Sequence, residues 1–402
     1  MNKKWPSSSS SLAASGPSPS PSHRVVHSCL VLAQVFFGLG SVVGGLGLPS
    51  MNPLAFALYR EIAASILLFL GVFLQQKQHE QNSKNNNNHH NESHNRSFTS
   101  HIKRFIILGA LIFGNQAAFI IGLKLAGSVA AAVWQPSQPI LTAAICMCLG
   151  WEAPDMRRIT GVLVAFAGCA FMVVLSTKAV ADDVDNLAPD DVVGTTSATS
   201  VLVGSFFFFI NCLCTSLYII LSKAVLNLYP SLTVTAWSYT IAAGFMAVAA
   251  FLVSLSSGTM AVLCPDCVGP WHFPSGALFA MAYFVVFVSV MSYSMITWAN
   301  QHVTGTLVMG YSVLQPVTAA ILTVGLLGMG VYPTCAEAAV GSACLDPPGW
   351  GTILGMVGVF CGLSLIISTE PRKKVNERES YKPVSSDEAI ELAIMNQPQQ
   401  TD

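Results

Sequence analysis

Hydrophobic residues occur in blocks of roughly twenty along this 402-residue chain, separated by shorter polar stretches. A helix that rises 1.5 Å per residue needs about that many residues to cross the roughly 30 Å hydrocarbon core of a bilayer. The pattern therefore predicts an all-α membrane protein with ten transmembrane helices, at residues 25–47, 53–74, 104–123, 127–149, 159–176, 201–222, 233–254, 276–298, 304–327 and 350–368.

The polar stretches divide the chain into segments of different character. Residues 1–24 are rich in Ser and Pro and contain no acidic residue, so they predict a disordered N-terminal tail. Residues 75–102 read as an Asn-rich loop with five histidines, and residues 177–200 as an acidic loop. The charged residues 369–402 predict a second disordered tail on the cytoplasmic side.

The chain repeats itself at an offset of about 178 residues. Gln138-Pro139 recurs as Gln315-Pro316, 177 residues later, and Gly127 recurs as Gly305, 178 residues later. The second and seventh predicted helices match at an offset of 179, and two glycines of the fifth match two of the tenth at 194. Because each half holds an odd number of helices, the second half enters the membrane from the opposite side. The sequence thus predicts two inverted five-helix repeats, 25–176 and 201–368.

Basic residues set the expected orientation, because Lys and Arg near helix ends favour the cytoplasm. With the N-terminus inside, 16 of the 19 Lys and Arg residues lie on the cytoplasmic side, which predicts an N-in/C-in protein. The glycosylation sequons at Asn91 and Asn95 then face the cytoplasm. Four loop cysteines fall outside, where a disulfide, a free thiol and a zinc site with His272 are the alternatives; they are Cys264, Cys267, Cys335 and Cys344.

Composition narrows the class of protein further. Hydrophobic residues make up 52% of the chain and charged residues only 10%, against about 25% charged in soluble domains, so most of the surface faces lipid. The net charge of -1 comes without a basic cluster that alternates with aromatics, which argues against nucleic-acid binding. HExxH, Walker and GxSxG motifs are absent from the sequence, so we expect no enzyme, no catalytic residue, no cofactor and no bound metal.

Arg60 and Glu61 are the strongest candidates for a functional site. They lie inside the second predicted helix, about 10 Å below its outer end, and ionisable groups inside a bilayer are costly unless they face a cavity or a partner. A guanidinium offers bidentate geometry, so we interpret Arg60 as an anchor for an anion or carboxylate and Glu61 as its partner or a protonatable coupling group. The alternative is a buried ion pair that fixes helix packing.

Other polar and aromatic residues inside the predicted helices have weaker claims, because amides also join helices and Trp and Tyr also form interfacial belts. The amides include Gln34, Gln135, Asn300 and Gln301, and Trp298 is a further aromatic. The residues expected to bind substrate are Arg60, Glu61, Asn115, Gln116, Trp134, Gln138, Asn211, Tyr239, Tyr293, Tyr311 and Gln315. Pro139 and Pro316 are expected to kink their helices around a cavity.

These residues resemble the EamA-type transporters of the drug/metabolite transporter superfamily. The resemblance is carried by Leu58-Tyr59-Arg60, by residues 119–128 followed by Gln138-Pro139, and by residues 298–305 followed by Gln315-Pro316, and it extends over about residues 28–368. The family commonly has a glutamate after the fourth and ninth helices; Glu152 supplies the first, whereas residues 329–331 lack the second.

The resemblance implies a central cavity between the halves and transport of small metabolites, often with proton coupling. We therefore expect a secondary transporter that works by alternating access, with a multi-pass receptor or an intramembrane enzyme as the alternative. The expected partners are a small-molecule substrate and the lipid bilayer, no nucleic acid, and optionally a second copy in a homodimer. We expect the plasma membrane, with an internal membrane as the other location.

Overall fold

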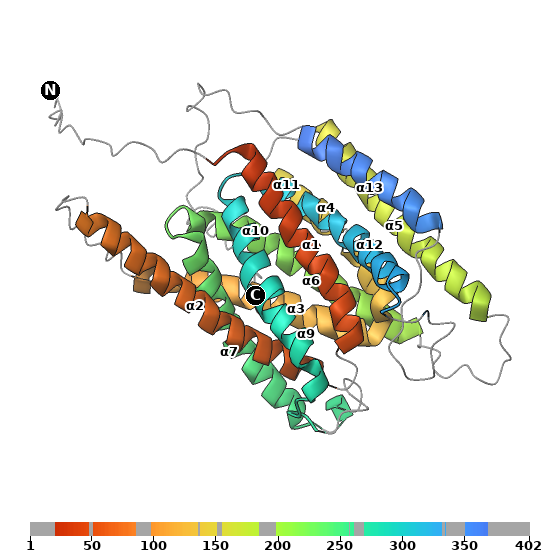
Figure 1. The fold of residues 1–402 in the computed structure, drawn as a ribbon, viewed down its shortest axis with the longest axis horizontal. Helices are drawn as coiled ribbons and strands as arrows, with labels where there is room; N and C mark the ends of the chain where they lie inside the picture. The colour runs from red at the N-terminus through yellow and green to blue at the C-terminus, as the bar shows by residue number, and fades with distance from the viewer. Residues whose placement is uncertain are drawn as a thin grey trace, which may run out of the picture.

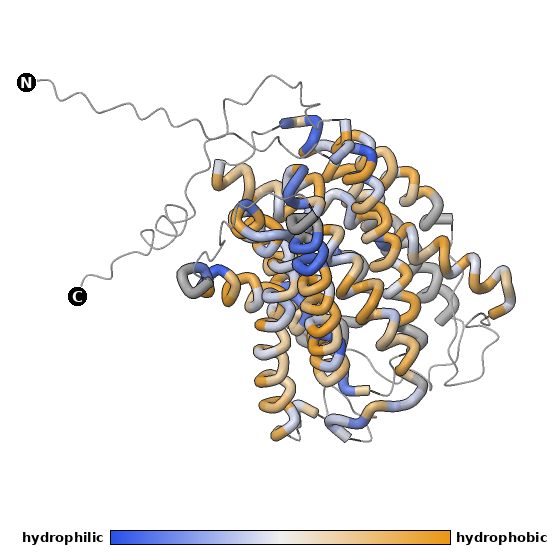
Figure 2. Tube along the Cα trace, turned by 60° about the vertical axis from the view of Figure 1, so that its left-hand side comes forward, coloured by the Kyte–Doolittle hydropathy of each residue, from blue (hydrophilic) through white to orange (hydrophobic). Residues whose placement is uncertain are grey.

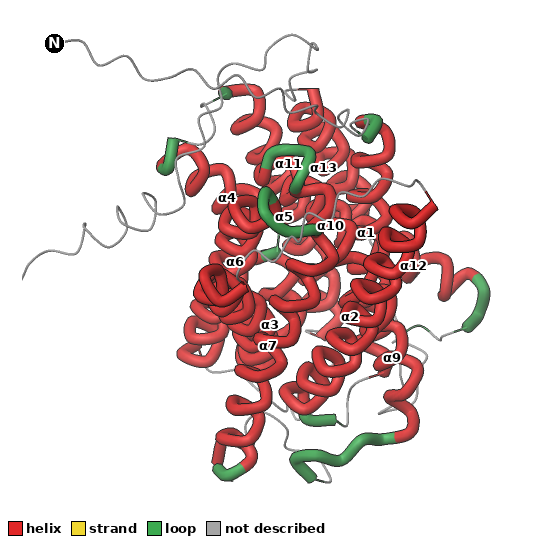
Figure 3. The backbone as a smooth tube through the Cα atoms, turned by 90° about the vertical axis from the view of Figure 1, so that its left-hand side faces the viewer, coloured by secondary structure: helices red, strands yellow, loops and turns green. Residues whose placement is uncertain are grey.

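The computed structural model describes residues 21–47, 51–85, 98–135, 137–150, 155–184, 198–256, 258–260, 269–331, 334 and 350–368. Helices and loops, without a strand, make up this described part (Figure 3). The elements are α1 (His23–Gly47), α2 (Pro53–Asn85), α3 (Phe98–Trp134), α4 (Ser137–Cys148), α5 (Met156–Val184), α6 (Ala198–Leu226), α7 (Ser231–Ser254), η1 (Ser275–Ala277), α9 (Leu278–Tyr283), η2 (Phe284–Ser292), α10 (Tyr293–Asn300), α11 (Gly305–Gly310), η3 (Tyr311–Val313), α12 (Leu314–Gly328) and α13 (Trp350–Ser368).

The predicted all-α membrane class is confirmed. Seven helical segments of the described chain are long and apolar enough to cross a membrane, and two further apolar helices, 137–148 and 354–368, are shorter. Hydrophobic residues run along most of the helical tube (Figure 2). Large apolar side chains also point outward, among them Phe279 at 75% and Leu202 at 73% exposure. A surface of this kind suits lipid rather than water.

The boundary between the third and fourth predicted helices was wrong. The sequence predicts a break between residues 123 and 127, but α3 continues to Trp134 and α4 begins only at Ser137. The intervening residues are rich in Ala, which favours helix, and contain no proline. Pro136 disfavours helical geometry at the residue before it, so the chain turns there instead.

Two helices extend beyond their hydrophobic stretches. α2 continues to Asn85, where the sequence predicts a loop from residue 75, and α5 continues to Val184. Gln, Lys and Glu, which are frequent in this end of α2, are good helix formers, and glycine and proline are absent from it. A polar helical extension of this kind protrudes beyond the apolar part that a bilayer can cover.

The eighth and ninth predicted helices are each built from several pieces. The eighth runs through α9, the π-helical segment η2 and α10, and the ninth through α11, the 3-10 turn η3 and α12. π-helical turns are rare and occur mostly at functional sites. Thr304 caps the start of α11, where its side chain accepts a hydrogen bond from the backbone of Leu307.

The helices pack in pairs that join distant parts of the sequence. α5 lies along α13 at one end of the molecule, and α2 packs on α7 on the other side (Figure 1). Between them, α3 packs on α6 and α7, α1 on α12, and α4 on α6 and α11. The segments α9, η2 and α10 pack on α1, and η2 also packs on α2. The largest buried apolar cluster is formed by residues of nearly all of these helices.

Several predicted features lie outside the described residues. These are the two tails apart from residues 21–24, most of the Asn-rich loop with both sequons, most of the acidic loop, and the cysteines Cys264, Cys267, Cys335 and Cys344.

Candidate functional site

Arg60 and Glu61 lie in the middle of α2, where α7 and the π-helical segment η2 pack against it. Glu61 is fully buried, and Arg60 is half-buried. The guanidinium carbon of Arg60 lies 5.9 Å from the centre of the Phe284 ring, within cation–π range. Both carboxylate oxygens of Glu61 and the Nε of Arg60 are buried without a hydrogen-bond partner among the described residues.

Two tyrosines complete this group. The rings of Tyr239 in α7 and Tyr293 in α10 meet edge to face, with their centres 5.2 Å apart. Arg60 and Glu61 both act electrostatically on the two phenols. The structure therefore brings four of the expected site residues together, from α2, α7 and α10, and we call Arg60, Glu61, Tyr239 and Tyr293 the central cluster.

The central cluster combines charge with unsatisfied hydrogen-bonding capacity. A buried polar group without a partner costs about 1–3 kcal/mol, and more when it is charged. Arg60 offers N–H donors, the Glu61 carboxylate offers acceptors, and the Tyr239 hydroxyl, which is also buried without a partner, offers both. Chemically, the cluster is suited to bind a small molecule that carries an acidic group beside a ring or other flat part.

Asn115, Gln138 and Asn211 belong to a second group, between α3, α4 and α6. Asn115 donates from its amide to the hydroxyl of Thr215, and Asn211 donates to the backbone carbonyl of Asn115 at 2.8 Å. Gln135 links the remaining two: it donates to Asn211 Oδ1 at 3.3 Å and accepts from Gln138 Nε2 at 2.6 Å. We call Asn211, Gln135 and Gln138 the first amide latch.

Tyr311 and Gln315 form a third group with α1. Gln315 donates from Nε2 to Oε1 of the buried Gln34 at 2.7 Å, and the Tyr311 hydroxyl lies 2.6 Å from Nδ1 of His27. We call Gln34 and Gln315 the second amide latch. Each of its residues is 177 positions after or before a residue of the first, since Asn211 corresponds to Gln34 and Gln315 to Gln138.

The last two expected residues lie apart from the central cluster. Gln116 in α3 is buried, and neither atom of its amide has a partner among the described residues. Trp134, at the end of α3, lines an apolar surface hollow of about 500 Å³ together with Leu202 and Phe206 of α6. The expectation that Trp134 stacks a solute in the central pocket therefore has no support from its position, because its neighbours are lipid-type side chains.

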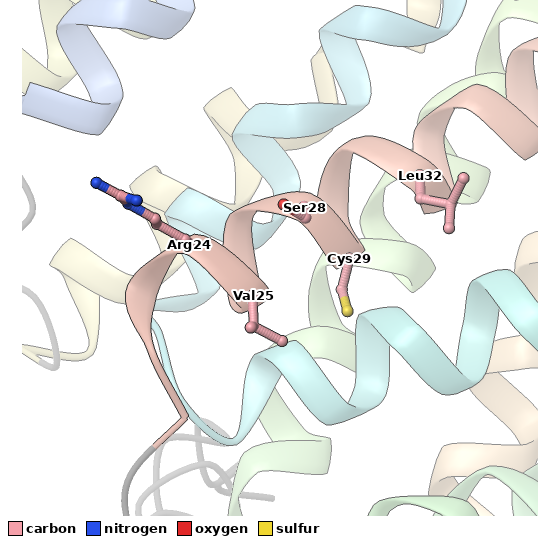
Figure 4. A pocket seen from close by; sticks show the side chains of 5 residues that line it. All are labelled: Arg24, Val25, Ser28, Cys29 and Leu32. Atoms are coloured by element: carbon pink, nitrogen blue, oxygen red, sulfur yellow. The ribbon is translucent and has the colours of Figure 1, made fainter.

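The central cluster is closed in this conformation. A further hollow of about 250 Å³ follows the start of α1 and is lined by Arg24, Val25, Ser28, Cys29 and Leu32 (Figure 4). Neither of these two hollows is lined by a residue of the central cluster. Within the described residues, moreover, no group of three or more His, Cys, Asp or Glu side chains is arranged to hold a metal ion.

Sequence reasoning missed the hydroxyl side chains around the cluster. Tyr218, Ser238, Ser289 and Thr297 are buried, and their hydroxyl oxygens have no hydrogen-bond partner among the described residues. Ser and Thr are so common in membrane helices that composition does not single them out. The spacing of Ser289, Tyr293 and Thr297 along one helix was the available signal.

Comparison with known proteins confirms the resemblance to EamA-type transporters. Residues 25–174 match the EamA-like transporter family. A WAT1-related protein of Arabidopsis thaliana is 24% identical over 297 residues, which cover 71% of this chain and 70% of the relative. The uncharacterized transporter YyaM of Bacillus subtilis is 26% identical over 198 residues, which cover 49% of this chain and 55% of YyaM.

A solved crystal structure of a protein shares the fold. It superposes with a TM-score of 0.60 at 13% sequence identity and covers 87% of this chain and all of its own. The similarity at this identity concerns the fold alone. Together with the seven apolar helices, the family match identifies an integral, multi-pass membrane protein that is related to transporters.

Proposed function

We propose that this chain, which matches the EamA-like transporter family over residues 25–174, is a secondary transporter of a small organic metabolite. The central cluster is its binding site. The observation that carries this proposal is the fully buried Glu61 beside Arg60, whose polar atoms face neither water nor a partner among the described residues. Intramembrane ionisable groups in such a position are most often part of a substrate or ion pathway.

Arg60 anchors an acidic group of the substrate in this proposal. Phe284 lies against the guanidinium, and a ring in that position leaves the N–H edges available for bidentate hydrogen bonds. Tyr239 and Tyr293 then contact the remainder of the substrate, through ring faces and hydroxyl groups. Glu61 balances the charge of Arg60 while the site is empty and takes up a proton when the anion binds, which couples transport to protons.

Alternating access is supported by reciprocal helix packing. If the halves are inverted repeats, α1 corresponds to α6 and α12 to α4, so the contact between α1 and α12 repeats that between α6 and α4. In the same way, the contacts of α3 with α6 and α7 correspond to those of the α9–α10 segment with α1 and α2. Two nearly equivalent halves allow two states of similar free energy, each open to one side of the membrane.

The remaining parts of the proposal concern topology. We take the protein to cross the membrane ten times with both termini in the cytoplasm, because this arrangement places 16 of the 19 Lys and Arg residues inside. The plasma membrane is the proposed location. Glycan on Asn91 or Asn95 of the expressed protein would contradict the orientation.

Uptake by the purified full-length protein in proteoliposomes tests the site. A panel of radiolabelled organic acids, neutral metabolites and amines is offered with and without an inward proton gradient. We expect uptake of acids, reduced at least about tenfold by Arg60→Ala, which corresponds to roughly 1.4 kcal/mol of lost binding. Arg60→Lys should retain part of it, because the charge remains but the bidentate fork is lost. Arg157→Ala, at an exposed position in α5, is the matched control.

A thermal unfolding midpoint, measured for each variant, separates binding from packing. A purely structural Arg60–Glu61 pair predicts that Arg60→Ala unfolds at lower temperature but transports normally per folded molecule. Equal uptake of every acid by the wild type and Arg60→Ala would eliminate the proposed site.

A further inference from the structure

A line of buried polar groups follows one face of α10. Tyr293, Thr297 and Asn300 are four and three residues apart, which places them on the same side of the helix, and Ser289 precedes them in η2. Ser289, Thr297 and Asn300 are fully buried. At the end of this line, Asn300 donates to the backbone carbonyl of Ile219 at 2.7 Å and to the Ser222 hydroxyl at 3.1 Å.

Side chains of α6 and α7 connect this line to the central cluster. The Tyr218 hydroxyl interacts with Thr297 and Ser238, although the geometry falls short of a full hydrogen bond to either. The Tyr239 hydroxyl interacts in the same way with Ser289 and lies within electrostatic range of Glu61. Polar oxygens thus follow one another from Asn300 to Glu61.

The hydroxyls on this route differ from other buried hydroxyls in the same helices. Thr235 and Thr240 of α7 and Thr215 of α6 each donate to a carbonyl one turn earlier in their own helix, at 2.9 Å. Most buried Ser and Thr side chains in helices are satisfied in that way. Along the route, in contrast, oxygens are buried without a partner among the described residues; they belong to Asn300, Thr297, Tyr218, Ser238, Ser289, Tyr239 and Glu61. We call these seven residues the hydroxyl file.

We propose that the hydroxyl file conducts protons between Glu61 and the end of the bundle where α6 and α10 terminate. The inference rests on the proposed function, since it assigns the route by which the coupling proton reaches its acceptor. A hydroxyl is both donor and acceptor, so each one passes its own proton onward and receives another, with bridging water where oxygens are too far apart. The net change is one proton taken from water at the Asn300 end and bound by the Glu61 carboxylate, and nothing is oxidised or reduced.

The opposite end of the site is covered, which favours this direction. The Tyr59 hydroxyl donates to the backbone carbonyl of Trp271 at 3.2 Å, and the Asn52 amide donates to that of Pro270 at 3.1 Å. These bonds hold the segment before η1 over the start of α2. At the file's other end, Gln301 is half-buried and His302 is exposed directly after Asn300. The charged and titratable groups that act on Glu61 are Arg60, Tyr239 and Tyr293.

Infrared spectroscopy of the reconstituted full-length protein tests the file without a known substrate. The band of the protonated Glu61 carboxyl is assigned by its loss in Glu61→Gln, over roughly pH 4 to 8. Its shift after transfer to D₂O then reports how fast the proton exchanges. We expect Tyr218→Phe combined with Thr297→Val to slow this exchange about tenfold or more, equivalent to roughly 1.4 kcal/mol on the barrier.

The matched control removes two hydroxyls that are bonded elsewhere, in Thr235→Val combined with Tyr283→Phe, since Tyr283 donates to the carbonyl of Phe36 at 2.9 Å. Exchange in this control should equal the wild type. If the first double variant does not fold, Tyr218→Phe and Thr297→Val are measured singly.

Two outcomes would overturn the file: exchange at the wild-type rate in the Tyr218 and Thr297 variants, or the absence of any protonated Glu61 band in that pH range. Uptake by the same samples is measured in parallel. Normal uptake with unaltered exchange would remove the file and leave the transporter, whereas slowed exchange in a protein that transports nothing would keep the file and refute the proposed function.

Discussion

Gly168 allows α5 and α13 to approach closely. A Cβ atom at this position would lie 2.8 Å from both the carbonyl oxygen of Gly355 and the backbone nitrogen of Val359. Both neighbours are backbone atoms, which cannot rotate away as a side chain would. Close contact of backbones through small residues is a common way of joining helices in lipid, where the hydrophobic effect does not drive them together.

Gly168→Ala should therefore destabilise the protein by about 1–3 kcal/mol, the usual cost of overpacking. Gly244 in α7 is the matched control, because nothing lies within 4 Å of its added Cβ. Gly244→Ala should be neutral or should stabilise by up to about 1 kcal/mol, as expected for removing glycine from a helix. Thermal unfolding of the detergent-solubilised variants measures both, and equal midpoints would show that the α5–α13 contact relaxes easily.

At the level of single residues, the sequence predicted more of the packing than of the site. Matching glycines in the fifth and tenth predicted helices indicated equivalent positions, but a repeat does not say that equivalent helices touch each other. The ionisable pair in α2 stood out because charge in a hydrophobic stretch is rare. The hydroxyls of Tyr218, Ser238, Ser289 and Thr297 did not, since only their shared location in three dimensions distinguishes them.

Helical elements followed the hydrophobic blocks closely, and their exceptions have local causes. α13 has the predicted bounds, whereas the end of α3 moved because proline, rather than glycine, stops a helix firmly. The π-helical segment η2 could not be predicted, because its hydrophobic pattern is that of any buried helix. It matters nonetheless, since it carries Phe284 and Ser289 to Arg60 and Tyr239.

The start of α2 and the segment that covers it form one element pair. Asn52 caps α2 by accepting from the Leu54 backbone at 3.1 Å, while its amide donates to Pro270. Asn52→Ala removes both bonds, and Asn52→Asp keeps the cap but loses the donor. Only Asn52→Ala should therefore lower the unfolding midpoint, by about 1 kcal/mol of stability.

Both substitutions should loosen the covering segment. A membrane-impermeant maleimide should label Trp271→Cys about fivefold faster in either variant, as expected when roughly 1 kcal/mol of holding energy is lost. The measurement uses a background in which Cys264, Cys267, Cys335 and Cys344 are replaced by serine. Labelling that stays at the rate of the parent protein in both variants would show that the hydrogen bond to Pro270 does not hold this segment.

On the scale of the whole molecule, the two amide latches link the halves at equivalent positions. Gln34 and Gln315 bond directly, whereas Asn211 and Gln138 are joined through Gln135. The repeat in the sequence identified these positions as equivalent, but it did not indicate that each pair would join one half to the other. Hydrogen bonds between membrane helices contribute only about 0.6 kcal/mol on average, so latches of this kind can open during a transport cycle.

Alternating access predicts that the two latches open in turn. In a cysteine-depleted background, a short bifunctional thiol reagent should cross-link Gln34→Cys to Gln315→Cys and, separately, Gln138→Cys to Asn211→Cys. Each cross-link should abolish uptake until it is reduced, because closure of one side is then permanent. A transported acid should raise the cross-linking rate of one pair and lower that of the other, since inverted halves exchange conformations. Rates that change in the same direction, or uptake that survives both cross-links, would mean that the halves do not alternate.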